Sequence, residues 1–515
     1  MCNVAMQITL GDAPLSIDDV VAVARHNALI EVSAGAWERV RAARAVIEGL
    51  ADDIVPHYGV STGFGALATK HIPADMRAQL QRSLVRSHAA GSGPQVEVEV
   101  VRALMLLRIQ TLASGHTGVR PETLAAYVAM LNAGITPVVH EYGSLGCSGD
   151  LAPLAHCALA LMGEGPVRYH DDIVEASAAL ASESIVPVTL AEKEGLALIN
   201  GTDGMLGMLC LAIHDLRGLV SASDLVTAMS IDGLLGTDHV FAADLMALRP
   251  HPGQQVSAAN LRALLSGSGI RASHEGVDDG IVQDAYSLRC SPQVTGAVRD
   301  TIDHAAHVAG WELASAIDNP MVIDGRVESN GNFHGAPVAY ALDFLAIAVA
   351  DLASISERRT DRFCDKARNH GLPPFLADDP GVDSGHMIAQ YTAAGIVSEL
   401  KRLANPASVD SIPSSAMQED HVSMGWASGR KLRRAIDGLA RVLGIELLTA
   451  ARGIDLRAPL RPSAPVAAVI AALRETTPGP GPDRFLAPEI EQAVELVASG
   501  GAVAAANGVL AEHLA

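Results

Sequence analysis

The chain has 515 residues, of which 49% are hydrophobic and only 3% are aromatic. This composition excludes a disordered chain and favours helices around an aliphatic core, because strand-rich sandwiches and barrels draw on aromatic and β-branched residues. With 37 Lys and Arg against 58 Asp and Glu, the net charge of −21 argues against nucleic acid or an anionic membrane as a partner.

Cysteine usage and the N-terminal sequence indicate the compartment. The six cysteines include no CxxC pair, so neither a disulfide framework nor a structural zinc site is expected. We expect a cytoplasmic protein without a membrane span, because no basic and apolar leader opens the chain and no uncharged apolar run reaches about 18 residues. His304 and His307 are three residues apart on a predicted helix, but no nearby side chain completes a ligand set, so no metal is expected.

Helix signals dominate in chain order. A capping box at Ser16 opens the first predicted helix, and Pro94 and Pro121 each suit the first turn of a later one. Hydrophobic periodicity then extends over stretches longer than a usual globular helix, which indicates a bundle of long helices. The predicted helices cover residues 16–25, 33–50, 94–114, 121–134, 292–316, 336–364, 385–403 and 421–457.

The chain is expected to form one continuous, mainly α domain with three regions. These are an N-terminal helical region (residues 1–200), a central bundle of long helices (201–475) and a C-terminal helical tail (476–515). Irregular segments are few, and in a helical protein such loops carry function more often than the bundle does. They cover residues 58–65, 141–150, 200–204, 283–290 and 330–336.

Residues 143–156 match neither the common phosphate-binding motifs nor the esterase motif. The plain interpretation is a Gly-rich turn before a helix, with Asp150 as its N-cap. A more specific chemistry is also open, because the Gly149 nitrogen belongs to a residue without Cβ and can approach the Cys147 carbonyl carbon. Loss of two waters, one from the Ser148 side chain, would leave an imidazolone with an exocyclic methylene, which is a strong electrophile.

This segment resembles the signature of the aromatic amino-acid ammonia-lyases, which build 4-methylidene-imidazol-5-one (MIO) from an internal tripeptide that is usually Ala-Ser-Gly. Here Cys147 stands in place of the alanine and contributes only its backbone to the ring. The resemblance covers nearly the whole chain in the family's order. It is also carried by YGVSTGFG at 58–65, LVRSHAAG at 84–91, NGT at 200–202, QDAYSLRC at 283–290, NP at 319–320, GNFH at 331–334 and QEDHVSM at 418–424.

The resemblance implies an elongated bundle of long helices of the fumarase/aspartase-like type, with the MIO loop in a loop-rich N-terminal part. It also implies a homotetramer in which several subunits form each active site. The MIO methylene is expected to capture the substrate amine and make it a better leaving group. The pairs Ser87-His88 and Gln418-Glu419 are similar to the corresponding residues of those family members that convert L-histidine to trans-urocanate and ammonia. That reaction is the first step of histidine degradation.

Residue roles follow from the same resemblance. Tyr58 is expected to remove the β-proton, and Arg289 to bind the substrate carboxylate through its guanidinium fork. His88 and Glu419 are expected to contact the imidazole ring, and a phenyl substrate would leave both polar groups unpaired. Each residue also has a plain structural alternative, and helix capping alone explains Asp150 equally well. The remaining implied site residues are Phe333 and Gln418 at the substrate, and Asn200, Gln283, Tyr286 and Asp150 around MIO and the amine.

Two alternatives stay open. One is another reaction on the same cofactor, either deamination of tyrosine or phenylalanine or a 2,3-aminomutase. The other is a catalytically silent helical scaffold, which is disfavoured by the joint presence of Tyr58, Ser148, Gly149 and Arg289. Met417 and Ala285 depart from residues common in the family, and neither replaces a charged or proton-carrying group, so they affect substrate geometry more than reaction class.

Overall fold

The structure is a computed structural model that describes residues 7–51, 53, 57–63, 70–276 and 282–515. The chain divides into two compact units, and neither is a continuous stretch of sequence. The first unit comprises Met1–His214, Ala305–Asp343 and Pro406–Arg430, and the second comprises Asp215–His304, Phe344–Asn405 and Lys431–Ala515.

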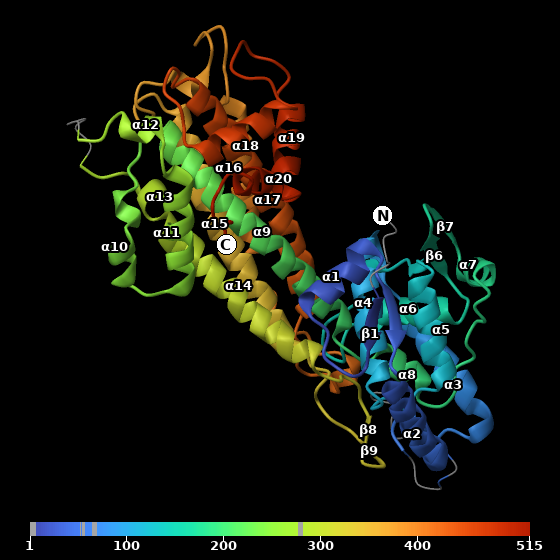
Figure 1. The fold of residues 1–515 in the computed structure, drawn as a ribbon. Coiled ribbons are helices and arrows are strands. Elements are labelled where there is room, and N and C mark those ends of the chain that lie inside the picture. Colours follow the sequence, from blue (N-terminus) through green and yellow to red (C-terminus); the bar gives the residue numbers. More distant parts are fainter. Residues whose placement is uncertain (1–6, 52, 54–56, 64–69, 277–281) are drawn as a thin grey trace. The chain divides into compact units, whose positions relative to one another are not determined.

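Helices predominate in both units, which confirms the mainly α fold class (Figure 1). The longest ones contribute residues to both units. They are α9 (Asp203–Gly233), α14 (Ser291–Leu313), α15 (Ala336–Cys364) and α17 (Gly425–Asp455).

The first unit combines helices with short strand pairs. Helix α1 packs on α4, and α3 packs on both α6 and α8. Strands β1 and β2 pair in parallel, whereas β3–β5, β4–β6–β7 and β8–β9 pair antiparallel. Its elements besides the long helices are β1 (Gln7–Leu10), α1 (Ile17–His26), β2 (Leu29–Val32), α2 (Ala34–Ala51), η2 (Ala74–Met76), α3 (Arg77–His88), β3 (Ser92–Gln95), α4 (Val98–Ala113), α5 (Pro121–Asn132), β4 (Thr136–Pro137), β5 (His140–Tyr142), α6 (Leu151–Leu161), β6 (Pro166–Tyr169), β7 (Asp172–Glu175), α7 (Ala176–Ser182), α8 (Glu194–Ile199), β8 (Met321–Ile323), β9 (Arg326–Glu328) and η5 (Ser415–Met417).

The named elements of the second unit are all helices in the part of the chain that the structure describes. Helices α18, α19 and α20 pack on one another (Figure 1). Ala389 and Ala393 of α16 form a buried cluster with Ile445 of α17. Its elements besides the long helices are η3 (His239–Phe241), α10 (Ala243–Ala247), α11 (Pro252–Leu265), α12 (Gly269–Ala272), α13 (Tyr286–Arg289), η4 (Pro374–Leu376), α16 (Met387–Leu403), α18 (Ala464–Arg474), α19 (Ala487–Ala498) and α20 (Gly501–Asn507).

Local capping signals explain where several helices begin. The Ser16 hydroxyl accepts a hydrogen bond from the Asp19 backbone N–H, and the Asp19 carboxylate accepts from the Ser16 N–H, so the predicted capping box is confirmed. Pro121 occupies the first turn of α5 as predicted. The prediction for Pro94 is wrong. It lies in β3, whose register shifts between Ser92 and Gln95, because proline's fixed φ suits an extended strand and its missing N–H is tolerated at an irregular position.

Helix α9 is long, yet the sequence analysis did not predict it. Its residues are buried on nearly all sides, so no amphipathic stripe marks it. By length and composition, Glu194–Gly233 and Ala336–Cys364 could cross a membrane, but their most apolar windows are 100% and 61% buried within the protein. Such burial is typical of the core helices of a bundle.

Candidate active site

The tripeptide Cys147-Ser148-Gly149 lies in the loop between β5 and α6, in the first unit. Gly149 has a φ of +83°, and a Cβ at this position would lie 2.1 Å from the Gly201 carbonyl oxygen. Only glycine fits, because other residues rarely adopt this φ and have no room here. The Asp150 N–H donates to the same Gly201 oxygen at 2.7 Å. The tripeptide is therefore held directly against the backbone of the 200–204 loop.

Asp150 acts differently from the predicted helix cap. It precedes α6, but its side chain accepts no capping hydrogen bond from that helix. Its carboxylate instead accepts from the Gly204 and Met205 N–H groups, both at 2.9 Å, and from the Ser144 hydroxyl at 2.8 Å. Asp150 thus caps the first turn of α9 and joins the tripeptide loop to it. Burial raises the pKa of Asp150 to about 7 despite these donors.

Glu419 contacts the tripeptide directly. Its Oε1 accepts from the Ser148 hydroxyl at 2.9 Å, and its Oε2 accepts from the Cys147 thiol at 3.1 Å and from the Ser414 hydroxyl at 2.8 Å. Backbone hydrogen bonds in both directions between Ser414 and Glu419 close this turn. Burial, followed by the adjacent Glu419, raises the pKa of the Cys147 thiol to about 12. The thiol is therefore protonated at neutral pH and acts as a hydrogen-bond donor.

Asn200 approaches the tripeptide from the end of α8. Its Nδ2 donates to the Ser148 carbonyl oxygen at 3.0 Å. Its Oδ1 is buried and has no hydrogen-bond partner among the described residues. A buried amide oxygen left unpaired is unfavourable, so this atom is available to a group that enters the site.

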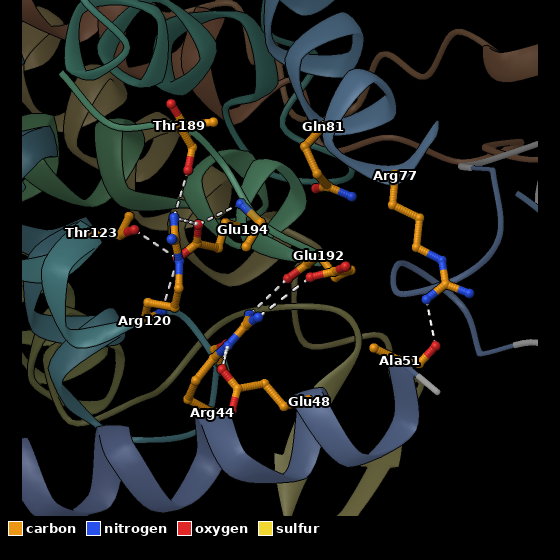
Figure 2. Close-up of polar contacts among 12 residues, drawn as sticks. Arg44, Glu48, Ala51, Arg77, Gln81, Arg120, Thr123, Thr189, Glu192 and Glu194 are labelled. Atoms are coloured by element: carbon orange, nitrogen blue, oxygen red, sulfur yellow. Dashed lines mark hydrogen bonds and ion pairs between the residues drawn. The ribbon is translucent and has the colours of Figure 1, made fainter. Parts of the chain in front are cut away.

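The N-terminal end of α8 is fixed by a polar network (Figure 2). The buried Glu194 carboxylate accepts from the Arg120 side chain at 2.7 Å, from the Thr123 hydroxyl at 2.7 Å and from the Ala191 N–H at 2.8 Å. The Gly195 N–H donates to the fully buried Gln81 of α3 at 2.9 Å. These contacts fix the helix that carries Asn200.

His88 is the last residue of α3. Its Nδ1 lies 2.9 Å from the Leu84 carbonyl oxygen and 3.1 Å from the Ser87 hydroxyl. Because a carbonyl oxygen can only accept, Nδ1 carries the proton and Nε2 is left as an acceptor. Burial lowers the pKa of His88, and the Leu84 carbonyl and the Glu419 charge oppose that shift.

One pocket of about 560 Å³ in the first unit brings several predicted site residues together. Tyr58, His88, Ser148, Asn200 and Glu419 all line it. Apolar side chains form much of the remaining wall, as is usual for a small-molecule site. The other lining residues are Gly63, Lys70, Ile72, Leu80, Ser83, Leu84, Ser87, Leu151, Leu196, Ile199 and Ser415.

Other predicted site residues do not line this pocket in the part of the chain that the structure describes. Phe333 and Gln418 belong to the first unit, outside the lining. Gln283, Tyr286 and Arg289 belong to the second unit. There the Arg289 guanidinium lies 4.7 Å from the centre of the Tyr286 ring, a cation–π contact. Residues 64 and 65 of the predicted loop 58–65 lie outside the described residues.

Sequence reasoning missed several groups at this site. Ser414 was not predicted, although it lies five residues before Glu419 and pairs with its backbone. Lys70 was also missed, and a lone lysine carries no motif that could have marked it. The ion pair between Arg108 and Asp203, the first residue of α9, was missed because a buried ion pair has no signature in a single sequence.

The loop fits an internally formed MIO group. Its geometry excludes a side chain at Gly149, and the Asn200 Oδ1 needs a partner. Among the described residues, no group of three or more His, Cys, Asp or Glu side chains could hold a metal ion. The described cysteines are free thiols, and Cys2 lies outside the described residues.

Comparisons with known proteins agree over nearly the full length. Residues 15–475 match the aromatic amino acid lyase family. The chain is 64% identical over 507 residues to histidine ammonia-lyase of Streptomyces griseus, with 98% of each chain covered. The structure of histidine ammonia-lyase from Trypanosoma cruzi is similar at 39% identity and a TM-score of 0.90, covering 98% of this chain and 96% of that one. Tyrosine aminomutase from Streptomyces globisporus is similar at 38% identity and a TM-score of 0.93, covering 99% and 100%.

Proposed function

Because the chain belongs to the aromatic amino acid lyase family and is an enzyme of the lyase class, we propose that it eliminates ammonia non-oxidatively from L-histidine to give trans-urocanate. This reaction would be the first step of histidine degradation in the cytoplasm. One observation carries the proposal: Ser148, His88 and Glu419 line a single pocket. A relative at 64% identity is a histidine ammonia-lyase.

We propose that the cofactor is MIO, formed autocatalytically from Cys147-Ser148-Gly149. When present, it supplies an electrophile that captures the substrate amine, a chemistry that no standard side chain offers. The Nδ2 of Asn200 donates to the Ser148 carbonyl oxygen, which would become the ring carbonyl. That contact supports a role for Asn200 in holding and polarising the group, in the manner of an oxyanion hole.

Two groups of the pocket suit an imidazole substrate. The tautomer of His88 leaves Nε2 as an acceptor, and the Glu419 carboxylate accepts hydrogen bonds through both oxygens. Both groups therefore favour a ring that carries N–H donors, and a phenyl ring would leave them unpaired in a partly buried site. Tyr58, which lines the same pocket, is proposed to remove the β-proton.

The remaining roles rest on family resemblance. Arg289 is proposed to bind the substrate carboxylate, and its partly buried guanidinium has an Nε without a partner among the described residues. Gln283 and Tyr286 are proposed to act around MIO, and Phe333 and Gln418 around the substrate. We further propose a homotetramer whose active sites combine residues from several subunits, with neither nucleic acid nor membrane as a partner.

An aminomutase acting on tyrosine is the second candidate. Its support is the similarity of the fold to tyrosine aminomutase, at a TM-score of 0.93. The same fold occurs with both reactions, so the fold alone does not decide between them. Glu419 does not separate the two candidates, because the tyrosine hydroxyl can donate to this carboxylate as an imidazole N–H can. The products formed from each amino acid therefore have to distinguish them.

The purified protein tests these proposals directly. It is incubated separately with L-histidine, L-tyrosine and L-phenylalanine, and ultraviolet absorbance of the conjugated product is followed together with ammonia release. Urocanate and ammonia are expected from L-histidine alone. A β-amino acid formed from tyrosine would establish the second candidate instead. The intact mass should be two waters below the encoded mass, and Ser148→Ala should abolish both the mass loss and most of the activity.

A further inference from the structure

Two buried residues behind the tripeptide have no role in the proposed reaction. Arg108 of α4 is fully buried, and Asp203, the first residue of α9, has a side chain only 6% exposed. The Asp203 Oδ2 accepts from the Arg108 Nη2 at 2.6 Å and from its Nε at 3.0 Å. A buried ion pair contributes little to stability in general, so its position calls for another explanation.

The Arg108 guanidinium donates hydrogen bonds to three backbone carbonyl oxygens near the 200–204 loop. It donates to the carbonyl oxygens of Ala197 at 3.0 Å, Asn200 at 3.3 Å and Ile317 at 3.0 Å. The end of α8, the segment at residue 317 and the start of α9 are thereby joined through one side chain. A planar, always charged guanidinium suits such a junction, because it presents several donors in a rigid arrangement.

The guanidinium is also packed against Gly201. A Cβ on Gly201 would lie 1.8 Å from the Arg108 Nη2, and a Cβ on Gly149 would lie 2.1 Å from the Gly201 oxygen. Three groups are thus stacked in order: the guanidinium, the Gly201 peptide and the backbone of Gly149. Both glycines lack the atom that would separate these layers. Gly201 therefore cannot move away from Gly149 while Arg108 is held by Asp203.

We infer that the Arg108–Asp203 ion pair is a positioning device for the cyclisation of Cys147-Ser148-Gly149, because it fixes the peptide that backs Gly149. This inference rests on the proposed MIO chemistry. In ring closure, the Gly149 nitrogen bonds to the Cys147 carbonyl carbon. The carbonyl oxygen leaves as water with the hydrogens of the Gly149 and Ser148 nitrogens. The second water takes the Ser148 hydroxyl and the hydrogen on its Cα, so no oxidant is required.

The physical basis is the restriction of Gly149. Intramolecular bond formation is fast when the reacting atoms are held in contact, because little conformational freedom is lost in reaching the transition state. Gly149 is permissive in backbone conformation, so in a free loop it would move away from Cys147. Arg108 touches none of the reacting atoms and acts through Gly201, so it is a positioning residue.

The test compares two buried arginines of the same helix. Arg102 is 4% exposed and donates to the carbonyl oxygens of Val23 and Leu131, away from the loop. Arg108→Met, Arg108→Lys and Arg102→Met are expressed in the full chain, folded protein is isolated by size exclusion, and its intact mass and unfolding temperature are measured. Most of the folded Arg108→Met protein is expected to lack the loss of two waters. Arg102→Met should be fully processed even if it unfolds at a lower temperature, and Arg108→Lys should be partly processed.

Each outcome decides one claim. Complete water loss in folded Arg108→Met, or equal loss of processing in Arg102→Met, overturns the inference. If Arg108→Met yields no folded protein, Asp203→Ala replaces it, because it removes the acceptor of the Arg108 Nε and Nη2. Unprocessed, folded Asp203→Ala supports the inference, and complete processing overturns it. A wild-type mass without water loss would instead contradict the proposed cofactor, so the two failures are distinguishable.

Discussion

The two carboxylate oxygens of Glu419 have different neighbours. Oε2 accepts from the Cys147 thiol and the Ser414 hydroxyl, and Oε1 accepts from the Ser148 hydroxyl. If Ser148 loses its hydroxyl as proposed, Oε1 loses this donor while Oε2 keeps both of its own. Oε1 is therefore the oxygen that we expect to accept an N–H of the substrate.

Replacing this carboxylate should impair turnover of L-histidine without preventing cofactor formation. We expect Glu419→Gln to lower kcat/KM about 10- to 100-fold, because a hydrogen bond to a charged group contributes roughly 1.5–3 kcal/mol. Steady-state assays of urocanate absorbance measure the effect, and the intact mass should still be two waters short. Ser414→Ala is the matched control and should have a smaller effect, because Cys147 still donates to Oε2. Unchanged activity in Glu419→Gln would refute its assigned role.

The buried carboxyl of Asp150 predicts a pH effect on stability. Its pKa is about 7 in the folded protein, against 3.8 ordinarily. The folded state therefore binds the proton more tightly, and stability decreases as pH rises from about 4 to 7. One pKa unit corresponds to about 1.4 kcal/mol, so this contribution is of the order of 4 kcal/mol.

Asp150→Asn cannot titrate and should lose this pH dependence. Its amide oxygen can accept from the Gly204 and Met205 N–H groups, and its NH2 can donate to the Ser144 oxygen. Unfolding temperatures of both proteins are measured from pH 5 to pH 8. We expect the variant to gain stability relative to wild type as the pH rises. A constant difference over this range would show that Asp150 does not titrate there.

At the scale of elements, the sequence predicted helices best where a cap or a stripe marks them. The Ser16 capping box and the Pro121 start are confirmed, and the prediction 336–364 coincides with α15. Helix α9 was not predicted because burial on nearly all sides removes the amphipathic stripe. The prediction that Pro94 begins a helix was wrong because the fixed φ of proline suits both a helix start and an extended strand. Hydrophobic periodicity and capping residues therefore predict partly exposed helices better than helices inside the core.

Helix α8 provides the prediction at this scale. Glu194→Ala removes the acceptor for Arg120, Thr123 and Ala191 (Figure 2), and a buried donor left without a partner, here the Thr123 hydroxyl, costs about 1–3 kcal/mol. We expect a clearly lower unfolding temperature, measured by circular dichroism. Glu192→Ala is the control, because Arg44 keeps its contacts with Glu48 at 2.9 Å and with the Glu192 carbonyl oxygen at 3.0 Å. The loss of the 3.5 Å ion pair with the Glu192 carboxylate should therefore cost less. Equal effects would argue against a special role for Glu194.

At the scale of the whole molecule, the motifs did not predict which of the expected site residues lie together. Five of the predicted site residues line one pocket of the first unit, whereas three others belong to the second. Motif order along a chain carries no information on whether two motifs meet within one subunit or between subunits. The expected division into an N-terminal region (1–200), a central bundle (201–475) and a C-terminal tail (476–515) stays a prediction. The residues of the pocket are Tyr58, His88, Ser148, Asn200 and Glu419, and those of the second unit are Gln283, Tyr286 and Arg289.

The proposed sharing of active sites between subunits can be tested by complementation. Ser148→Ala and Arg289→Met should each be inactive alone, because one lacks the cofactor and the other lacks the carboxylate-binding group. If Ser148 and Arg289 of one active site come from different subunits, tetramers that mix both variants contain some sites with both wild-type residues. With random assortment, each of the two contributing subunits is the required variant in about half of the cases. About a quarter of all sites in a symmetric homo-oligomer therefore carry both wild-type residues.

We therefore expect co-expression to restore about a quarter of the wild-type activity per site. Two differently tagged variants, purified through both tags, isolate the mixed oligomers, and urocanate formation measures their activity. The control pairs Ser148→Ala with Glu419→Ala. Ser148 and Glu419 lie 2.9 Å apart in the same unit of one chain, so every site of that mixture carries one of the two defects and the mixture should be no more active than Glu419→Ala alone. No activity in the Ser148→Ala and Arg289→Met mixture would show that Arg289 serves the pocket of its own subunit or has another role. Activity in the control above that of Glu419→Ala alone would show that Ser148 and Glu419 of one site come from different subunits.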